Sequence, residues 1–236
     1  MIELLKERAW ANGIELTELQ AERFERYHEM LTEANARFNL TRVDNDPAEA
    51  IDRNYLDCIL PIPKGVFDGV NSVIDVGSGA GFPGLPLAIC LDDIHFVLLD
   101  SLGKRVEFLN SVIAELGLNA EAVHLRAEDA ARTENMREKF DVAVARAVAP
   151  MNLLCEYLLP FVRVGGRMLA YKGPALDEEL AQAAFALETL GGKTEYVMPL
   201  PMAGRDWEHR LAVITKVKPT PEKYPRKAGK AEKKPL

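Results

Sequence analysis

An aspartate and four glycines follow a short apolar run in the first third of the chain. The run and the residues after it read Ser72-Val-Ile-Asp75-Val-Gly77-Ser-Gly79-Ala-Gly81-Phe82-Pro83-Gly84. β-Branched apolar residues are typical of a buried parallel strand, and closely spaced glycines let the backbone turn sharply and approach a ligand. The pattern therefore predicts a strand that ends in a cofactor-binding loop.

Two kinds of cofactor fit this loop. Counted from Gly79, its glycines follow G-x-G-x-x-G, the pattern that places a dinucleotide pyrophosphate at a helix N-terminus. Counted from Asp75, they follow D-x-G-x-G-x-G, and a carboxylate at the mouth of the loop repels a pyrophosphate but attracts a cation. S-adenosylmethionine carries an ammonium and a sulfonium, so charge favours this cofactor, with Asp75, Gly79 and Gly81 beside it.

Carboxylates follow the next two predicted strands. Asp100 closes the second strand, 19 positions after Gly81, where a carboxylate can bind both ribose hydroxyls of an adenosine. Dinucleotide and S-adenosylmethionine sites share this feature, and capping of the next helix is the alternative role of Asp100. Ala127 and Glu128 follow the third strand, where backbone and carboxylate groups can face an adenine amino group. Helix capping is the alternative there too.

Basic residues end the fourth and fifth predicted strands. Arg146 can hold the methionine carboxylate or the substrate, and Lys172 has the same placement. The chain lacks both an Asp/Asn-Pro-Pro-aromatic run, which accepts protons from an amino group, and a Pro-Cys pair for covalent attack. The target is therefore an atom with a free lone pair, and we assign no general base or nucleophile. Scattered cysteines and histidines predict no metal site.

Strands and helices alternate from Ser72 onward and must position these residues. We expect seven strands, at about 72–76, 94–100, 121–126, 141–146, 167–172, 193–200 and 209–216. Helices are expected over 104–116, 150–159 and 176–190, and the last two strands, without a helix between them, should pair antiparallel. The pattern predicts an α/β fold with a doubly wound, seven-stranded, mostly parallel sheet.

The N-terminal part of the chain is expected to be helical. Thr17 and Gln20 have the spacing of a capping box, and apolar residues recur at helical intervals after them. We therefore divide the chain into a helical cap at 1–65, a main domain at 66–216 and a tail at 217–236.

Charge is unevenly distributed between the body and the tail. Residues 216–236 hold seven Lys and one Arg against two Glu, a local charge of +6, which leaves −13 for residues 1–215 because the whole chain carries −7. Such a basic tail is expected to be disordered and suits a phosphate backbone, although a solubilising role is the alternative. No stretch approaches the ~20 apolar residues of a membrane span, so we expect a cytoplasmic protein.

Longer motifs resemble one family over nearly the whole chain. They are Asn39-Leu-Thr41, Asp75 to Gly84, Leu98-Leu-Asp-Ser-Leu-Gly-Lys-Arg105, Arg146-Ala, Lys172-Gly173 and the tail from Lys223-Tyr-Pro-Arg-Lys227. This set resembles the glucose-inhibited division protein B family, ribosomal RNA small-subunit methyltransferase G. The sequence departs from the family pattern at Asn54, where many members have His, and at His209-Arg210, where the common order is reversed.

The resemblance implies a class I methyltransferase fold with an N-terminal helical extension. It implies transfer of a methyl group from S-adenosylmethionine to N7 of a guanine in 16S rRNA, with cofactor contacts at Gly77, Phe82, Ala127, Glu128 and Arg146. We expect a monomer whose partner is 16S rRNA in the small ribosomal subunit or its precursor. Two alternatives stay open: a class I methyltransferase acting on a small molecule or protein, and a dinucleotide-binding oxidoreductase or redox sensor.

Overall fold

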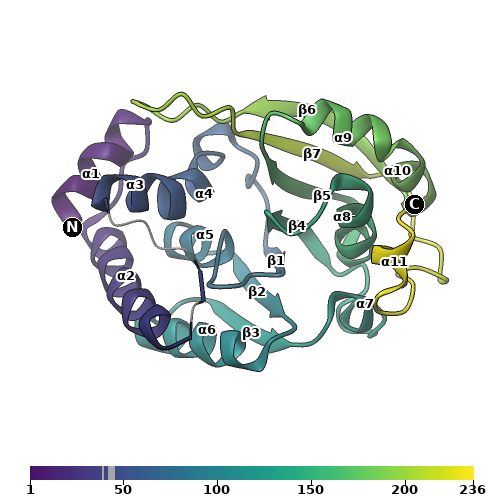
Figure 1. Ribbon diagram of the computed structural model, residues 1–236, viewed down its shortest axis with the longest axis horizontal. Helices are drawn as coiled ribbons and strands as arrows, with labels where there is room; N and C mark the ends of the chain where they lie inside the picture. The colour runs from purple at the N-terminus through teal and green to yellow at the C-terminus, as the bar shows by residue number, and fades with distance from the viewer. Residues whose placement is uncertain (39, 42–45) are drawn as a thin grey trace.

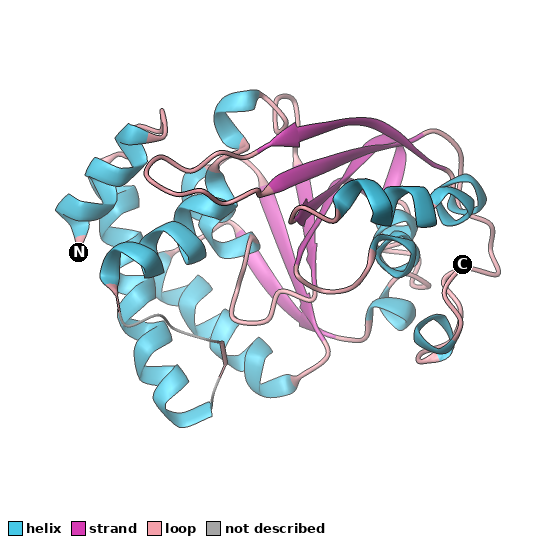
Figure 2. Cartoon of the chain, turned by 45° about the horizontal axis from the view of Figure 1, so that its top comes forward, coloured by secondary structure: helices cyan, strands magenta, loops and turns pink. Residues whose placement is uncertain are grey.

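The computed structural model describes residues 1–38, 40–41 and 46–236. Asn39 of the N-terminal motif lies outside the described residues. A single sheet forms the centre of the molecule, and helices cover both of its faces (Figures 1 and 2). Within the described ranges, no helix combines the length and the apolar character needed to cross a membrane.

The sheet has seven strands in the order β3-β2-β1-β4-β5-β7-β6. In chain order the strands are β1 (Ser72–Val76), β2 (His95–Asp100), β3 (Ala120–His124), β4 (Phe140–Arg146), β5 (Val162–Lys172), β6 (Gly192–Pro199) and β7 (Arg210–Lys216). β1 to β5 are parallel, whereas β7 pairs antiparallel with both β5 and β6. This arrangement confirms the predicted doubly wound, mostly parallel sheet and the antiparallel pairing of its last two strands.

Neighbouring residues of the central strands pack into two separate cores. Val73 belongs to the core under the N-terminal helices, whereas Ile74 belongs to the core on the opposite face. Alternate side chains of a strand point to opposite faces, so a continuous apolar run satisfies both layers. The first layer contains α1 (Ile2–Ala11), α2 (Glu18–Phe38), α3 (Pro47–Ala50), a π-helical turn η1 (Ile51–Leu56), α4 (Asp57–Ile59), a 3₁₀ turn η2 (Ile62–Lys64), α5 (Gly84–Cys90) and α6 (Gly103–Leu116).

The second layer holds the remaining helices. They are α7 (Ala127–Ala130), α8 (Met151–Leu158), a 3₁₀ turn η3 (Leu159–Phe161), α9 (Leu176–Gln182), α10 (Ala184–Leu190) and α11 (Lys230–Lys233). The single helix expected over 176–190 is wrong, because the chain breaks at Ala183, where φ is −87° and ψ is 0°. Ala183 is fully buried, so packing on the core fixes this break in a segment of otherwise good helix formers.

The N-terminal helices share a core with the sheet. The predicted capping box is present at the start of α2, where Thr17 N–H donates to Gln20 Oε1 at 2.9 Å and Gln20 N–H donates to Thr17 Oγ1 at 3.2 Å. Tyr27 of α2 packs against Phe82 with ring centroids 5.7 Å apart, and its hydroxyl donates to the Ala80 carbonyl at 2.6 Å. α2 therefore holds the loop that follows β1. The division of the chain at residues 65 and 216 stays a prediction.

The last twenty residues differ from the expected disordered tail. Residues 217–236 pack on the second helical layer and end in α11 (Figure 1). Arg226 pairs with the buried Glu156 at 2.6 Å, while Arg137 donates to the carbonyls of Thr220 and Tyr224 at 2.8 and 2.9 Å. Composition gives no sign of this packing, because the partners of the tail lie far away along the chain.

Candidate functional site

The glycine loop after β1 is tied to the end of β2. The N–H groups of Gly77 and Ser78 donate to the Leu99 carbonyl at 2.8 and 3.1 Å, and Gly79 N–H donates to Asp100 Oδ2 at 2.9 Å. Gly79 has φ +60° and Gly81 has φ +110°, conformations that side chains strongly disfavour. The sequence pattern thus reflects a loop whose backbone needs these glycines.

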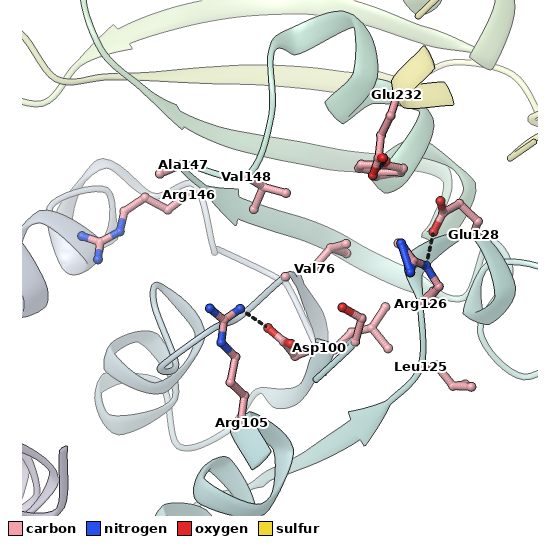
Figure 3. Close-up of a pocket in the computed structure, with 15 residues that line it drawn as sticks. Val76, Asp100, Arg105, Leu125, Arg126, Glu128, Arg146, Ala147, Val148 and Glu232 are labelled. Atoms are coloured by element: carbon pink, nitrogen blue, oxygen red, sulfur yellow. Dashed lines mark hydrogen bonds and ion pairs between the residues drawn. The ribbon is translucent and has the colours of Figure 1, made fainter. Parts of the chain in front are cut away.

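A pocket of about 340 Å³ opens where β1, β2 and β4 end (Figure 3). We call it the cofactor pocket. It is lined by Val76, Gly77, Leu99, Asp100, Ser101, Arg105, Leu125, Arg126, Ala127, Glu128, Arg146, Ala147, Val148, Tyr157 and Glu232. Ligands of open α/β sheets bind at this edge, outside the carboxyl ends of the strands. Five sequence-predicted residues meet here: Gly77, Asp100, Ala127, Glu128 and Arg146.

Asp100 has two sets of partners. Its Oδ2 accepts from Gly79 N–H at 2.9 Å and lies 3.4 Å from Arg105 Nη1, while its Oδ1 accepts from Leu102 N–H at 2.9 Å. Leu102 directly precedes α6, so Asp100 borders the pocket and also holds the residue before a helix, although α6 has no side-chain cap. Its role at the ribose stays a prediction. Since Asp100 is only 3% exposed, its carboxylate is held rigidly at the pocket wall.

Glu128 is the second buried carboxylate of the cofactor pocket. It lies in α7 and is 4% exposed, and Gly229 N–H donates to its Oε1 at 3.4 Å. Its Oε2 lies 4.0 Å from Arg126 Nε. A carboxylate with one long backbone contact keeps the capacity to accept further hydrogen bonds.

Four other predicted cofactor residues, Asp75, Gly79, Gly81 and Phe82, do not line this pocket. Asp75 lies behind the loop, where its Oδ2 accepts from Gly84 N–H at 2.9 Å. Its Oδ1 is buried and has no hydrogen-bond partner among the described residues. Burial raises the pKa of Asp75 to about 7, because a carboxylate loses hydration there.

The residues present fit S-adenosylmethionine. Asp100 and Glu128 supply acceptors for hydroxyl and amino groups, and Arg146 supplies a cation for a carboxylate. A Cβ at Gly77 would lie 3.1 Å from Val148 Cγ2, so glycine keeps the pocket wall open at that point. Among the described residues, no three His, Cys, Asp or Glu side chains are placed to hold a metal ion.

Arg146 lies between the cofactor pocket and a second pocket. Its guanidinium lies 4.9 Å from the centroid of the Phe82 ring, and its Nη1 donates to the Arg53 carbonyl at 2.6 Å and to Asp57 Oδ2 at 3.1 Å. The face of the Phe82 ring thus packs against the Arg146 guanidinium. Ala147, which lines both pockets, has φ +55°, an uncommon conformation for a residue other than glycine.

The second pocket has a volume of about 370 Å³ and lies between the N-terminal helices and the ends of β4 and β5. We call it the substrate pocket. Its lining is Thr41, Arg53, Asn54, Asp57, Arg146, Ala147, Tyr171, Lys172, Gly173, Leu200, His209 and Arg210. Lys172 is among the lining residues, and its Nζ donates to Glu179 Oε2 and the Ala149 carbonyl, both at 2.6 Å, while its role toward the substrate stays a prediction.

Sequence reasoning missed the acidic centre of the substrate pocket. Asp57 is 5% exposed and receives Arg146 on Oδ2, while its Oδ1 lies 2.8 Å from His209 Nδ1. These three residues are far apart along the chain, so no local spacing reveals the network. The only sequence sign was that His209 and Asn54 depart from the family pattern.

Asn54 brings a buried, unpaired polar atom to this pocket. It is 3% exposed, and its Nδ2 has no hydrogen-bond partner among the described residues. Asn54 lies in the π-helical turn η1, a rare local structure that is frequent at functional sites. A buried amide donor without a partner costs free energy unless a ligand accepts from it.

Trp207 stands beside the substrate pocket among cationic side chains. Its ring centroid lies 5.0 Å from Arg53 Cζ and 5.3 Å from Arg205 Cζ. The His209 ring lies 5.3 Å away. This edge of the pocket therefore combines an aromatic face with positive charge.

Comparison with known proteins identifies the family. Residues 20–205 match the GidB family model, described as rRNA small subunit methyltransferase G. The Ribosomal RNA small subunit methyltransferase G of Clostridium perfringens (strain 13 / Type A) is 44% identical over 99% of this chain and 98% of its own length. The protein of the same name from Brevibacillus brevis is 45% identical over 96% and 95%.

Solved structures share the fold at low sequence identity. A geranyl diphosphate methyltransferase in complex with GPP and sinefungin aligns over 85% of this chain and all of its own, with a TM-score of 0.53 and 14% identity. An rRNA methylase from Streptococcus thermophilus aligns over 68% and 96%, with a TM-score of 0.50 and 17% identity. The fold is that of class I S-adenosylmethionine-dependent methyltransferases. On the family model and the full-length relatives, the chain belongs to the GidB family of rRNA small subunit methyltransferases G.

Proposed function

We propose that this protein transfers a methyl group from S-adenosylmethionine to N7 of a guanine in 16S rRNA of the small ribosomal subunit. The observation that carries this proposal is the pair of adjoining pockets, one bordered by the predicted cofactor residues and one lined by charged side chains, with Arg146 and Ala147 in both. The relatives that share the family name support rRNA as the substrate.

We assign a role to each predicted cofactor residue. Asp100 would bind the ribose hydroxyls, and Ala127 and Glu128 would face the adenine. Gly77 gives the backbone close access, while Arg146 would meet the methionine carboxylate. The other four predicted residues would act outside the pocket lining. Asp75, Gly79 and Gly81 would shape the loop, and the Phe82 ring would pack against Arg146. When bound, S-adenosylmethionine would supply an electrophilic methyl group. The guanine N7 lone pair would attack its carbon, forming the carbon–nitrogen bond while the electron pair of the carbon–sulfur bond leaves with the sulfur.

The substrate pocket needs no general base for this reaction, because N7 carries no proton. Its side chains must orient the base and exclude competing geometries, and such positioning supplies most of the rate. Arg146 and His209 are both held by Asp57, so their directions are fixed before the substrate arrives. A guanine flipped out of its stack would enter this pocket, as bases do in other enzymes that modify them.

We also propose that the enzyme acts as a monomer in the cytoplasm, where ribosomal subunits are assembled. A methyltransferase for a small molecule or protein is the alternative within the fold. A dinucleotide-binding oxidoreductase is the alternative outside it, and the family model matched by residues 20–205 opposes it. Titration with NADH and with S-adenosylmethionine separates these last two.

Mapping of rRNA modifications tests the function directly. Mass spectrometry of 16S rRNA from cells that lack the gene should show one guanine without its N7 methyl group. Expression of this chain should restore the methyl group, whereas the Asp100→Ala variant at equal abundance should not. Restoration at an exocyclic amino group or on another RNA would overturn the proposal.

A further inference from the structure

The C-terminal segment reaches the cofactor pocket. Glu232, in α11, is one of the residues that line it. Figure 3 shows Glu232 and Glu128 at the same end of the pocket, with Arg146 at the other. The basic tail therefore places one acidic side chain, which stays exposed to solvent, at the edge of the pocket, and neither its composition nor its motif predicted this.

Buried contacts hold this segment in place. Lys216, at the end of β7, is fully buried, and its Nζ donates to the Thr220 hydroxyl and the Leu159 carbonyl, both at 2.6 Å. Further along, Tyr224 is 8% exposed and Ala231 is fully buried. Arg226 N–H and its guanidinium both donate to the buried Glu156. Anchors along its length thus fix the direction in which α11 approaches the body.

Two contacts join α11 to the pocket wall. The Tyr157 hydroxyl donates to Glu232 Oε1 at 3.1 Å, and Gly229 N–H donates to Glu128 Oε1 at 3.4 Å. Tyr157 and Glu128 belong to the body and also line the pocket. The segment consequently adds a second carboxylate to the end of the pocket where Glu128 already lies.

We propose that residues 229–236 form a wall of the cofactor pocket and that the Glu232 carboxylate accepts a hydrogen bond from the purine 6-amino group. This inference rests on the proposed function. With the ribose at Asp100, the purine extends toward α7, because Ala127 and Glu128 follow the neighbouring strand. An amino group between two carboxylates satisfies acceptors that otherwise repel each other.

The test measures cofactor affinity in the full-length protein by calorimetry. The probes are S-adenosylhomocysteine and S-inosylhomocysteine, whose 6-oxo group accepts where the 6-amino group donates. Glu232→Ala should weaken binding of S-adenosylhomocysteine about tenfold, the scale of one hydrogen bond to a charged group. The same variant should reduce the preference for S-adenosylhomocysteine over S-inosylhomocysteine by a similar factor, which mere loosening of the segment would not do.

Glu222→Ala is the matched control, since it removes an exposed carboxylate of the same C-terminal segment outside residues 229–236 and should leave both affinities unchanged. A chain that ends at Ala228 should lose affinity at least as strongly as Glu232→Ala. If Glu232→Ala binds both probes as the unchanged protein does, the inference is wrong. If the unchanged protein binds NADH and neither probe, the proposed function itself fails.

Discussion

Asp75 is buried, one of its carboxylate oxygens has no hydrogen-bond partner among the described residues, and its pKa is raised. Burial raises its pKa to about 7, from an ordinary value of 3.8. The folded protein therefore keeps a proton that the unfolded chain has already lost, and the free energy of unfolding should fall as pH rises from about 4 to 7. We propose that a cationic ligand bound in front of the loop favours the ionised form of Asp75, which would couple cofactor binding to loss of this proton.

This coupling predicts that cofactor affinity depends on pH, whereas the rate of methyl transfer does not. The affinity for S-adenosylmethionine should rise between about pH 6 and 7.5, and Asp75→Asn should remove the rise. Single-turnover methyl transfer at saturating cofactor should stay flat from about pH 6.5 to 8.5, because N7 needs no base. A tenfold rise in that rate per pH unit would contradict the proposed chemistry.

The unpaired amide of Asn54 leads to a second prediction. Guanine O6 is an acceptor beside N7, so Asn54 Nδ2 can find in the substrate the partner that the described residues do not supply. Asn54→Ala and the isosteric Asn54→Asp should both lower kcat/KM for small subunits about tenfold. Affinity for S-adenosylmethionine should not change. Equal kcat/KM values for all three proteins would place the base elsewhere.

In the loop after β1, substitution of Gly79 and substitution of Gly81 should have different effects on cofactor binding and on stability. A Cβ at Gly79 has no protein atom nearer than the Gly77 carbonyl at 3.9 Å, whereas one at Gly81 would lie 2.4 Å from Leu85 Cδ1 and 2.8 Å from the Tyr27 hydroxyl. Gly79→Val should therefore fold but lose cofactor binding through its unfavourable backbone angle.

Gly81→Val should instead lose stability, because it forces α2 and α5 away from the loop. Thermal unfolding and calorimetry together separate the two effects. A Gly79→Val protein with unchanged cofactor affinity would show that the loop tolerates side chains at this position.

The sheet was predictable from the sequence because each strand carries its own signal. Strand β1 has the expected bounds, and β2 and β4 differ by one residue at one end, since apolar runs and flanking turns mark both ends locally. The break at Ala183 and the π-helical turn around Asn54 could not be predicted, because packing decides them. The same holds for the contacts of Asp57, which join three distant parts of the chain.

For the whole molecule, the C-terminal segment shows where composition misleads. Its lysines indicated disorder, yet Glu156, Arg137 and Lys216 on the body provide partners that only the fold brings near. The lysines of the segment are exposed to solvent, while the Glu232 carboxylate borders the cofactor pocket. We therefore propose that one piece of chain contacts both the RNA and the cofactor.

The exposed lysines of this segment predict a salt effect. Replacing Lys227, Lys230, Lys233 and Lys234 with Gln should weaken binding to small subunits and flatten its salt dependence. Each lost phosphate contact removes about 0.9 from the log–log slope, by analogy with duplex DNA. Lys64→Gln, in η2 of the first helical layer on the other face of the sheet, is the control and should keep the full slope. An unchanged slope in the fourfold variant would assign the phosphate contacts to the body.

Trp207 gives the molecule a built-in optical reporter. The chain has two tryptophans, and the other, Trp10, is 71% exposed on α1. Trp207 lies against Arg53, Arg205 and His209, so any change in the charges around its indole ring alters its emission. In a Trp10→Phe protein, fluorescence would follow RNA entering the substrate pocket in real time, while cofactor binding alone would leave the signal nearly still.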